Sequence, residues 1–445
     1  MARRATIEQG QSWILAIWIA LSMVLGGGGS PNPASELVLQ LSCAALLVVY
    51  VFLEKDTPTH QTFSRSIMTI CALAVAIPLV QLIPLPAAIW HNLPGRDAMR
   101  DALALIDEDM SWRAFSIAPH LTLAGLLAIL PPAVLAILVA RQPVAVRTRL
   151  LGIIAFIALA SITLGGLQIA DGGTAFRLYP DAHLQWLTGF HANRNAAADV
   201  LLIGAMASAC WWASQAKRTA PVLLLVVALL LFAIGVIATG SRAGIVLLPV
   251  AGVGTAILLS LHALVKPGRA VGACASLLTF VSAILLWLSY TNTRIATVAA
   301  RFSAAGDARF DLWRDSWTAM RAYWPWGTGI GTFVPAFLPH ERIETIDATM
   351  PNRAHNDYLE LAIEAGLPGL LILAVIAVLV IRLALLAWKN PRVPRAHTIF
   401  ALQTFIVIAL HALVDYPLRN MAIASLAGVA LGLLSPPRVG TGSGS

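Results

Sequence analysis

The chain has 445 residues, of which 58% are hydrophobic and only 12% are charged, and its mean hydropathy is +0.78. Soluble domains carry about 25% charged residues, so the composition excludes a soluble protein and indicates one that is integral to a membrane. The pI of 9.7 comes without a basic run or RNA-binding motif, so we expect no nucleic-acid partner; positive charge in a polytopic protein mostly reports orientation.

Twelve apolar segments follow one another along the chain, each close to the ~20 residues that a membrane-spanning helix needs. They lie at 11–29, 36–53, 67–89, 121–140, 150–170, 196–215, 220–239, 243–265, 270–290, 366–388, 398–414 and 421–435. The first resembles a secretory signal, but no cleavage site is evident and "LGGGGSPNPAS" is typical of a loop. We therefore predict an all-α, polytopic bundle of about twelve transmembrane helices.

These segments divide the chain into four parts. Residues 1–290 hold spans one to nine, 291–365 form a large loop with short amphipathic helices and a candidate catalytic histidine, and 366–438 hold spans ten to twelve. Residues 439–445 are typical of a linker or tag remnant. All four cysteines fall inside spans, so we expect them to pack and to form no disulfide or metal site: Cys43, Cys71, Cys210 and Cys274.

The basic residues predict the orientation, because short loops with Lys or Arg stay in the cytoplasm. Such loops include every lysine and place both chain ends inside: "MARR", "EKDTPTHQTFSR", "RQPVAVRTR", "AKR", "KPGR" and "KNPRVPR". The opposite loops carry fourteen arginines and no lysine: 90–120, 171–195, 240–242, 291–365 and 415–420. Long loops escape the charge rule, but Arg242 and Arg419 lie in very short ones. Arginine forms paired hydrogen bonds to phosphate oxygens, so this excess favours an anionic, phosphorylated ligand on the outer side.

Two motifs place arginine at an outer helix start. In "GFHANRNAAADVLL", Asn193 and Asn195 could cap the helix or hold sugar hydroxyls, whereas Arg194 occupies a helix N-terminus, where a cation is unfavourable without an anion. In "ATGSRAGIVLLPVAG", Arg242 either extends to the lipid headgroups or contacts a phosphate, helped by the backbone N–H groups of Ser241 and Ala243.

The large loop contains "RFSAAGDARFDLWRDSWTAMRAYWPWGTGIGTFVP", in which residues 309–321 have the pattern of an amphipathic interfacial helix. Its apolar face would be Phe310, Trp313, Trp317 and Met320. Asp311, Arg314 and Asp315 would pair with one another, which leaves Arg309 and Arg301 as candidate anion contacts. The glycine-rich stretch that follows is a weak phosphate-binding signal.

The stretch "MPNRAHNDYLELAIEAGLPG" precedes the tenth span, and a helix from Ala354 would place His355 and Tyr358 on one side. A lone histidine is usually structural, yet this one stands beside Arg353 and Asp357, and a neutral imidazole accepts a proton from a hydroxyl near pH 7. Asp357 could orient it only if the chain folds back.

The loop "ALVDYPLRN" lies between the eleventh and twelfth spans. Its Asp415 and Arg419 are four residues apart, so they could simply pair with each other. Alternatively, Arg419 is a further cation at the outer mouth of the bundle.

Together these motifs resemble the O-antigen ligase and Wzy-type polymerase superfamily of bacterial envelope glycan assembly. They occur along the chain in the same order as in that family. The elements that carry the resemblance are "QLIPLPAAIWHNLPG", "FSIAPHLTLAGLL", "GFHANRNAAA", "TGSRAG", "RFDLWRDSW…WPWGTGIGTF" and "HNDYLELAIEAGLPG". The resemblance implies a GT-C-like, multi-pass protein of the inner membrane, surrounded by membrane lipids, with both termini cytoplasmic and its active site facing the periplasm.

The resemblance further implies a metal-independent, inverting glycosyltransferase that needs no cofactor. Its donor would be a glycan on undecaprenyl diphosphate, and in the ligase branch its acceptor would be a sugar hydroxyl of the lipid A-core oligosaccharide. His355 matches the family's histidine and would deprotonate the acceptor. Arg242 matches its turn arginine and would bind the diphosphate, and Arg309, or else Arg301, matches the second arginine. Supporting or acceptor-binding roles would fall to Asn193, Asn195, Asp357, Tyr358, Arg353 and Arg419, with Arg194 as a further diphosphate contact.

Two alternatives stay open. The ligase branch spaces its histidine-to-glycine element more tightly than His355 to Gly366, which leaves a Wzy-type polymerase as the nearest alternative. A polytopic lipid-linked glycan transporter is the second, although the halves show no convincing repeat and the polar residues gather on one side of the membrane.

Overall fold

The computed structural model describes residues 2–28, 33–54, 64–180, 182–215, 222–261, 309–346 and 350–437. The predicted ninth span, Arg301, Cys274 and residues 439–445 lie outside these ranges.

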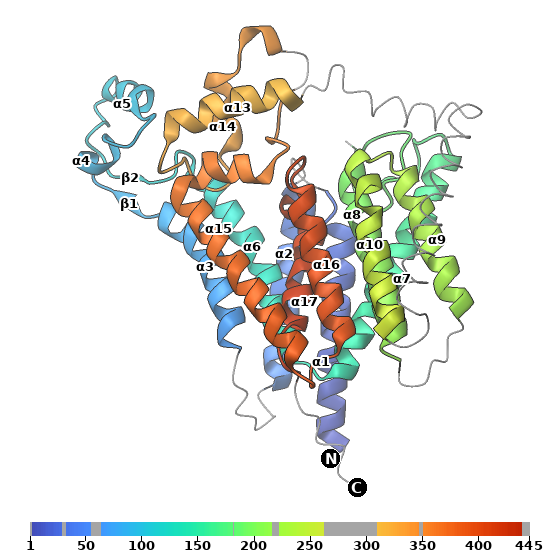
Figure 1. Ribbon diagram of the computed structural model, residues 1–445. Helices are drawn as coiled ribbons and strands as arrows, with labels where there is room; N and C mark the ends of the chain where they lie inside the picture. The colour runs from blue at the N-terminus through green and yellow to red at the C-terminus, as the bar shows by residue number, and fades with distance from the viewer. Residues whose placement is uncertain are drawn as a thin grey trace.

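Long apolar helices form the body of the protein (Figure 1). They are α1 (Ala2–Leu25), α2 (Pro33–Glu54), α3 (Arg65–Gln81), α6 (Pro119–Ala140), α7 (Val144–Ala170), α8 (Arg194–Ala213), α9 (Val222–Ala238), α10 (Arg242–Leu261), α15 (Asp357–Lys389), α16 (Arg395–His411) and α17 (Met421–Leu433). Six of them are long and apolar enough to cross a membrane: α2, α6, α7, α8, α10 and α15. The helical, polytopic architecture is confirmed, and the count of twelve spans stays a prediction.

Helix α8 lies at the centre of the bundle and is buried along almost its whole length. It packs against α7, α9, α10 and α16. Small residues allow this close approach, because a Cβ atom on Gly204 would lie 2.4 Å from Ala158 of α7, and one on Gly244 of α10 would lie 2.5 Å from Ala198. The N-termini of α8 and α10, with Arg194 and Arg242, are therefore held against the same central core.

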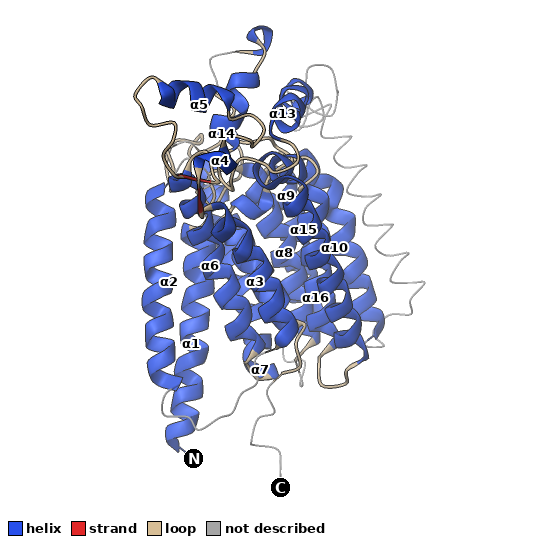
Figure 2. Cartoon of the chain, turned by 90° about the vertical axis from the view of Figure 1, so that its left-hand side faces the viewer, coloured by secondary structure: helices blue, strands red, loops and turns tan. Residues whose placement is uncertain are grey.

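Short elements gather at one end of the bundle, which we call the loop-bearing end (Figures 1 and 2). They are α4 (Ala87–Trp90), α5 (Asp97–Ala104), α13 (Arg309–Tyr323), α14 (Phe333–Phe337), the 3-10 turns η1 (Leu338–His340), η2 (Ile343–Thr345) and η3 (Pro417–Arg419), and two strands, β1 (Pro84–Leu85) and β2 (Arg113–Ala114), which pair antiparallel. The described parts of the predicted outer loops lie at this end (Figure 1).

The glycine-rich stretch after α13 is held against a kink in α15. Gly366 breaks that helix with φ 57° and ψ −153°, a conformation open almost only to glycine, and a Cβ there would lie 2.1 Å from the Pro325 carbonyl oxygen. The N–H groups of Thr328 and Gly329 donate to the Glu364 carbonyl. These donors are thus bonded within the protein rather than open to a phosphate.

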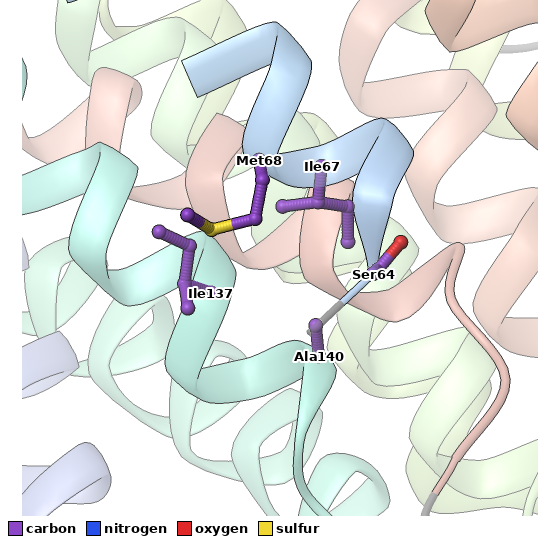
Figure 3. A pocket seen from close by; sticks show the side chains of 5 residues that line it. All are labelled: Ser64, Ile67, Met68, Ile137 and Ala140. Atoms are coloured by element: carbon purple, nitrogen blue, oxygen red, sulfur yellow. The ribbon is translucent and has the colours of Figure 1, made fainter. Parts of the chain in front are cut away.

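The opposite end carries both ends of the described chain (Figure 1). Arg147 is fully buried there, and its guanidinium donates to the backbone carbonyls of Ala140, Gln142 and Ser435. It thereby satisfies carbonyls at the C-terminal ends of α6 and α17, which would otherwise lack partners. A shallow hollow between α3 and α6 also lies at this end, lined by Ser64, Ile67, Met68, Ile137 and Ala140 (Figure 3).

Candidate functional site

His355 lies just before α15 rather than inside it. Asn356 caps that helix, because its side-chain oxygen accepts from the N–H groups of Tyr358 and Leu359, and the helix begins at Asp357. The prediction of a helix from Ala354, with His355 and Tyr358 on one face, is therefore wrong. His355 instead has a left-handed backbone, with φ 50°. This turn aims its ring across the bundle end, toward the loop after α16.

The partner of His355 is Asp415, which lies between α16 and η3. The Nδ1 atom of His355 is 2.9 Å from the Asp415 carboxylate, and the imidazole meets the Tyr416 ring at 5.0 Å between centroids. Asp415 therefore does not pair with Arg419, and it takes the orienting role considered for Asp357. The Asp415 side chain is 6% exposed and that of His355 is 28% exposed, so the histidine forms the outer part of the pair.

Electrostatics keep this carboxylate charged. Burial alone would raise the pKa of Asp415, but the hydrogen bond from His355 and the charges of His355, His411 and Arg309 hold its pKa below the ordinary value. Burial, and then Asp415, raises the pKa of the Tyr416 phenol to about 12. An ionised Asp415 accepts the Nδ1–H of His355, which leaves Nε2 of the ring as the proton acceptor.

A second imidazole–carboxylate pair lies directly behind the first. His411, the last residue of α16, places Nδ1 2.6 Å from Asp199 of α8, and its Nε2 lies 3.9 Å from the other oxygen of Asp415. Both side chains are 1% exposed. Neither residue was predicted from the sequence, although Asp199 is a carboxylate inside an otherwise apolar segment, which is itself a signal of function.

Trp186, in the loop before α8, contacts Arg194 and the turn that precedes Arg242. The guanidinium of Arg194 lies 5.3 Å from the centre of the Trp186 ring. The same ring covers Gly240, where an added Cβ would lie 2.3 Å from it, and Gly240 precedes Arg242 by two residues. Trp186 therefore joins the start of α8 to the turn before α10, at the loop-bearing end.

The turn before α10 closes through its own side chains. The N–H of Ser241 donates to Thr239 Oγ1 at 3.2 Å, and Ser241 Oγ accepts from the N–H of Gly244 at 3.1 Å. The Ser241 N–H is thus engaged within the turn, so the phosphate contact predicted for it is wrong. Arg242 is the first residue of α10 and lies at the same end of the bundle as His355 (Figure 1).

Helix α13 brings Arg309 toward the histidine. Trp313, one turn after Arg309, donates its indole N–H to the carbonyl of Ala354, the residue before His355. The charge of Arg309 also acts on Asp415 and His411. Its alternative, Arg301, lies outside the described residues.

The faces of α13 differ from the prediction. Phe310 and Trp317 are 62% and 56% exposed, while Asp315, Ser316 and Ala319 are buried. Asp311 and Asp315 bind Arg342, at 2.9 and 2.5 Å, rather than Arg314. The buried face of the helix therefore includes Met320 and Tyr323 beside Asp315, Ser316 and Ala319, while Phe310 and Trp317 lie outside.

The amide and phenol side chains that were predicted to support the site or bind the acceptor make contacts within the protein. Asn193 caps α8 by accepting from the Asn195 N–H, and its amide group donates to the Tyr416 hydroxyl. Asn195 is buried. The Tyr358 hydroxyl donates to the Ala409 carbonyl at 2.9 Å. The capping interpretation of Asn193 is thus confirmed.

Arg353 and Arg419 bind a buried acidic cluster on α15. Glu360 and Glu364 are fully buried; Arg353 lies 2.9 Å from Glu360, while Arg419 binds Glu364 and lies 3.0 Å from Glu360. Asp357 is at the edge, 4.0 Å from Arg419. The cluster fastens η3, and with it Asp415, to the helix that follows His355.

Replacing Arg419 with alanine should destabilise the protein by about 3–5 kcal/mol, because it leaves two buried carboxylates without their shared partner. The measurement is the thermal unfolding of the detergent-purified protein. Arg100→Ala is the matched control: its pairs with Asp97 and Asp101 are exposed, and such pairs contribute about 0–1 kcal/mol. Equal unfolding temperatures for the two variants would show that the cluster does not support the fold.

Within the described ranges, no group of three His, Cys, Asp or Glu side chains could hold a metal ion. The comparison with protein families finds one match, in which residues 225–374 fit the family described as O-antigen ligase. This segment includes Arg242, Arg309 and His355. A search of curated proteins returns no match.

Proposed function

We propose that this protein is an O-antigen ligase. Its residues 225–374 match the family described as O-antigen ligase, which places the chain in the O-antigen ligase and Wzy-type polymerase superfamily. The family acts on lipid-linked glycans, and the chain is a multi-pass membrane protein. The donor is a glycan on undecaprenyl diphosphate, and the acceptor is a sugar hydroxyl of lipid A-core. The site faces the periplasm from the inner membrane.

The observation that carries this proposal is the pairing of His355 with Asp415 at the end of the bundle that gathers the arginines. A hydrogen-bonded carboxylate fixes the Nδ1–H tautomer and leaves Nε2 to accept a proton. A base of this kind contributes roughly 10²–10⁴-fold to a rate.

The reaction is a single displacement. The acceptor oxygen attacks the anomeric carbon while its proton passes to Nε2 of His355, and a new glycosidic bond forms. The bond from the anomeric carbon to the diphosphate oxygen breaks, and undecaprenyl diphosphate leaves with the electron pair. Attack opposite to the leaving group inverts the anomeric configuration.

The leaving diphosphate gains negative charge, which cations must balance. Arg242 and Arg309 are the proposed principal contacts, with Arg194 and Arg301 as further candidates. Guanidinium groups bind phosphate oxygens in a fixed, paired geometry, so they stabilise charge that develops during bond breaking. Arg353 and Arg419 are assigned to the support of the site, because buried glutamates already bind both.

The polymerase remains the second candidate, since the same donor chemistry and the same family domain suit it. The transporter is less well supported. The buried carboxylate Asp199 lies only about 7.5 Å along α8 from the first residue of that helix, at the ~1.5 Å rise of a helix. A transporter would place such groups near the bilayer midplane.

The lipopolysaccharide of a deletion strain tests the proposal. Loss of a ligase should leave lipid A-core without O-antigen, while full-length polymer accumulates on its lipid carrier. A core that bears a single repeat would instead identify a polymerase. Lipid-linked glycan retained on the cytoplasmic face would identify a transporter.

A further inference from the structure

The site contains a second carboxylate and a second imidazole that the displacement does not use. Asp199, His411, Asp415 and His355 form a continuous row, with contacts of 2.6, 3.9 and 2.9 Å between successive residues. The row begins inside α8, crosses the end of α16 and reaches the loop before α15. Its inner members are 1% exposed, so water cannot take over their interactions.

The ring nitrogen of His411 that faces away from Asp199 is the unusual feature of this row. Its Nε2 atom is buried and makes no hydrogen bond, and the second oxygen of Asp199 is likewise buried and unbonded. A buried polar atom left in this way is unfavourable, because it has lost its water partners and gained no others. The Nε2 atom is aimed at Asp415, and at 3.9 Å it interacts with that carboxylate through charge rather than through a hydrogen bond.

We propose that His411 and Asp199 are positioning residues for the base. Asp199 holds His411 as an imidazolium, and this buried cation keeps Asp415 ionised and directed at His355. The inference rests on the proposed function, since it assigns how the same base is prepared. The charged groups that act on His411 are Asp199, Asp415 and Arg309.

This arrangement determines which ring nitrogen of His355 carries the hydrogen. An ionised Asp415 accepts a proton from Nδ1 and leaves Nε2 free to act as a base. A protonated Asp415 would donate to Nδ1 instead, and the ring would then carry its hydrogen on Nε2, where it could not deprotonate an acceptor hydroxyl. Without the His411 cation, Asp415 is more easily protonated. Restoring the active tautomer then requires a higher pH.

His411→Gln tests this with little change in side-chain size. The expected result is an acidic limb of the pH–rate profile displaced to higher pH by about one unit, with transfer about tenfold lower at pH values below that limb. Asp199→Asn should give the same displacement. His397→Gln is the matched control: His397 is equally buried on the same helix, but it bonds Thr148 at the opposite end. Its acidic limb should stay in place.

A double-variant cycle separates positioning from general support of the fold. If His411 acts through Asp415, adding His411→Gln to Asp415→Asn should cause little further loss, because the interaction is already absent. Independent, multiplicative losses, or an unshifted pH profile in both His411→Gln and Asp199→Asn, would overturn the proposal. The His355→Ala variant in the same assay separates this inference from the proposed function. If His355→Ala retains transfer, the proposed function fails. If His355→Ala loses transfer but the His411 and Asp199 variants show no displaced pH–rate profile, this inference alone fails.

Discussion

Alanine in place of His355 should abolish glycan transfer, with a loss of roughly 10²–10⁴-fold, the contribution of a positioned base. Donor binding should remain close to wild type, because the arginines that are proposed to hold the diphosphate are left in place. The measurement is the transfer rate in proteoliposomes supplied with lipid-linked glycan and lipid A-core, alongside the donor affinity. A fall in kcat without a fall in donor affinity is the expected pattern.

His120→Ala provides the control for this variant. His120 is exposed at the start of α6, at the same end of the bundle, and has no place in the row of imidazoles and carboxylates. Its rate should match that of the wild type. If His355→Ala makes product at a rate near that of His120→Ala, His355 is not the base.

Arg242→Ala should lower transfer by about 10²–10³-fold, by analogy with the removal of one donor to a developing oxyanion. Unlike the histidine variant, it should also weaken donor binding, because the diphosphate is charged before the reaction as well as after it. Arg309→Ala should behave in the same way. Lysine at position 242 should restore only part of the rate, since an ammonium group cannot make two parallel hydrogen bonds.

Arg392→Ala is the matched charge control for the arginine variants. Arg392 is exposed in the turn between α15 and α16, at the opposite end of the bundle, so its loss removes one positive charge away from the site. Donor affinity that is unchanged in both Arg242→Ala and Arg309→Ala would contradict the phosphate assignment.

Hydrophobic periodicity and length were enough to predict the bundle. Each described long helix coincides with a predicted span, because a run of apolar residues is what such a helix requires whatever its neighbours are. The end of the third span was misplaced, since α3 stops at Gln81 and the apolar residues that follow form β1 and α4. Apolar composition predicts burial or contact with lipid, but it does not say where the chain leaves the helix.

Local sequence singled out His355, Asp415 and Arg419, but it did not show how they pair and it did not point to His411 or Asp199. The rule that side chains four apart are neighbours applies only within a helix, and residues 415–419 are a loop and a 3-10 turn. Asp415 therefore faces His355, sixty positions earlier, and Arg419 faces the glutamates of α15. Contacts between segments so far apart in the chain follow from the packing of α15, α16 and η3. The spacing of residues within a short stretch of sequence does not predict that packing.

The buried Arg147 has a practical consequence for work on this protein. Because it holds the carbonyl of Ser435, the last turn of α17 is fastened to α6 and α7 on the face opposite to His355. Removing the residues around Ser435 would leave the buried guanidinium of Arg147 without one of its hydrogen-bond acceptors. Under the proposed orientation, a topology reporter joined after Pro437 would lie on the cytoplasmic side of the bilayer, and His355 would lie on the periplasmic side.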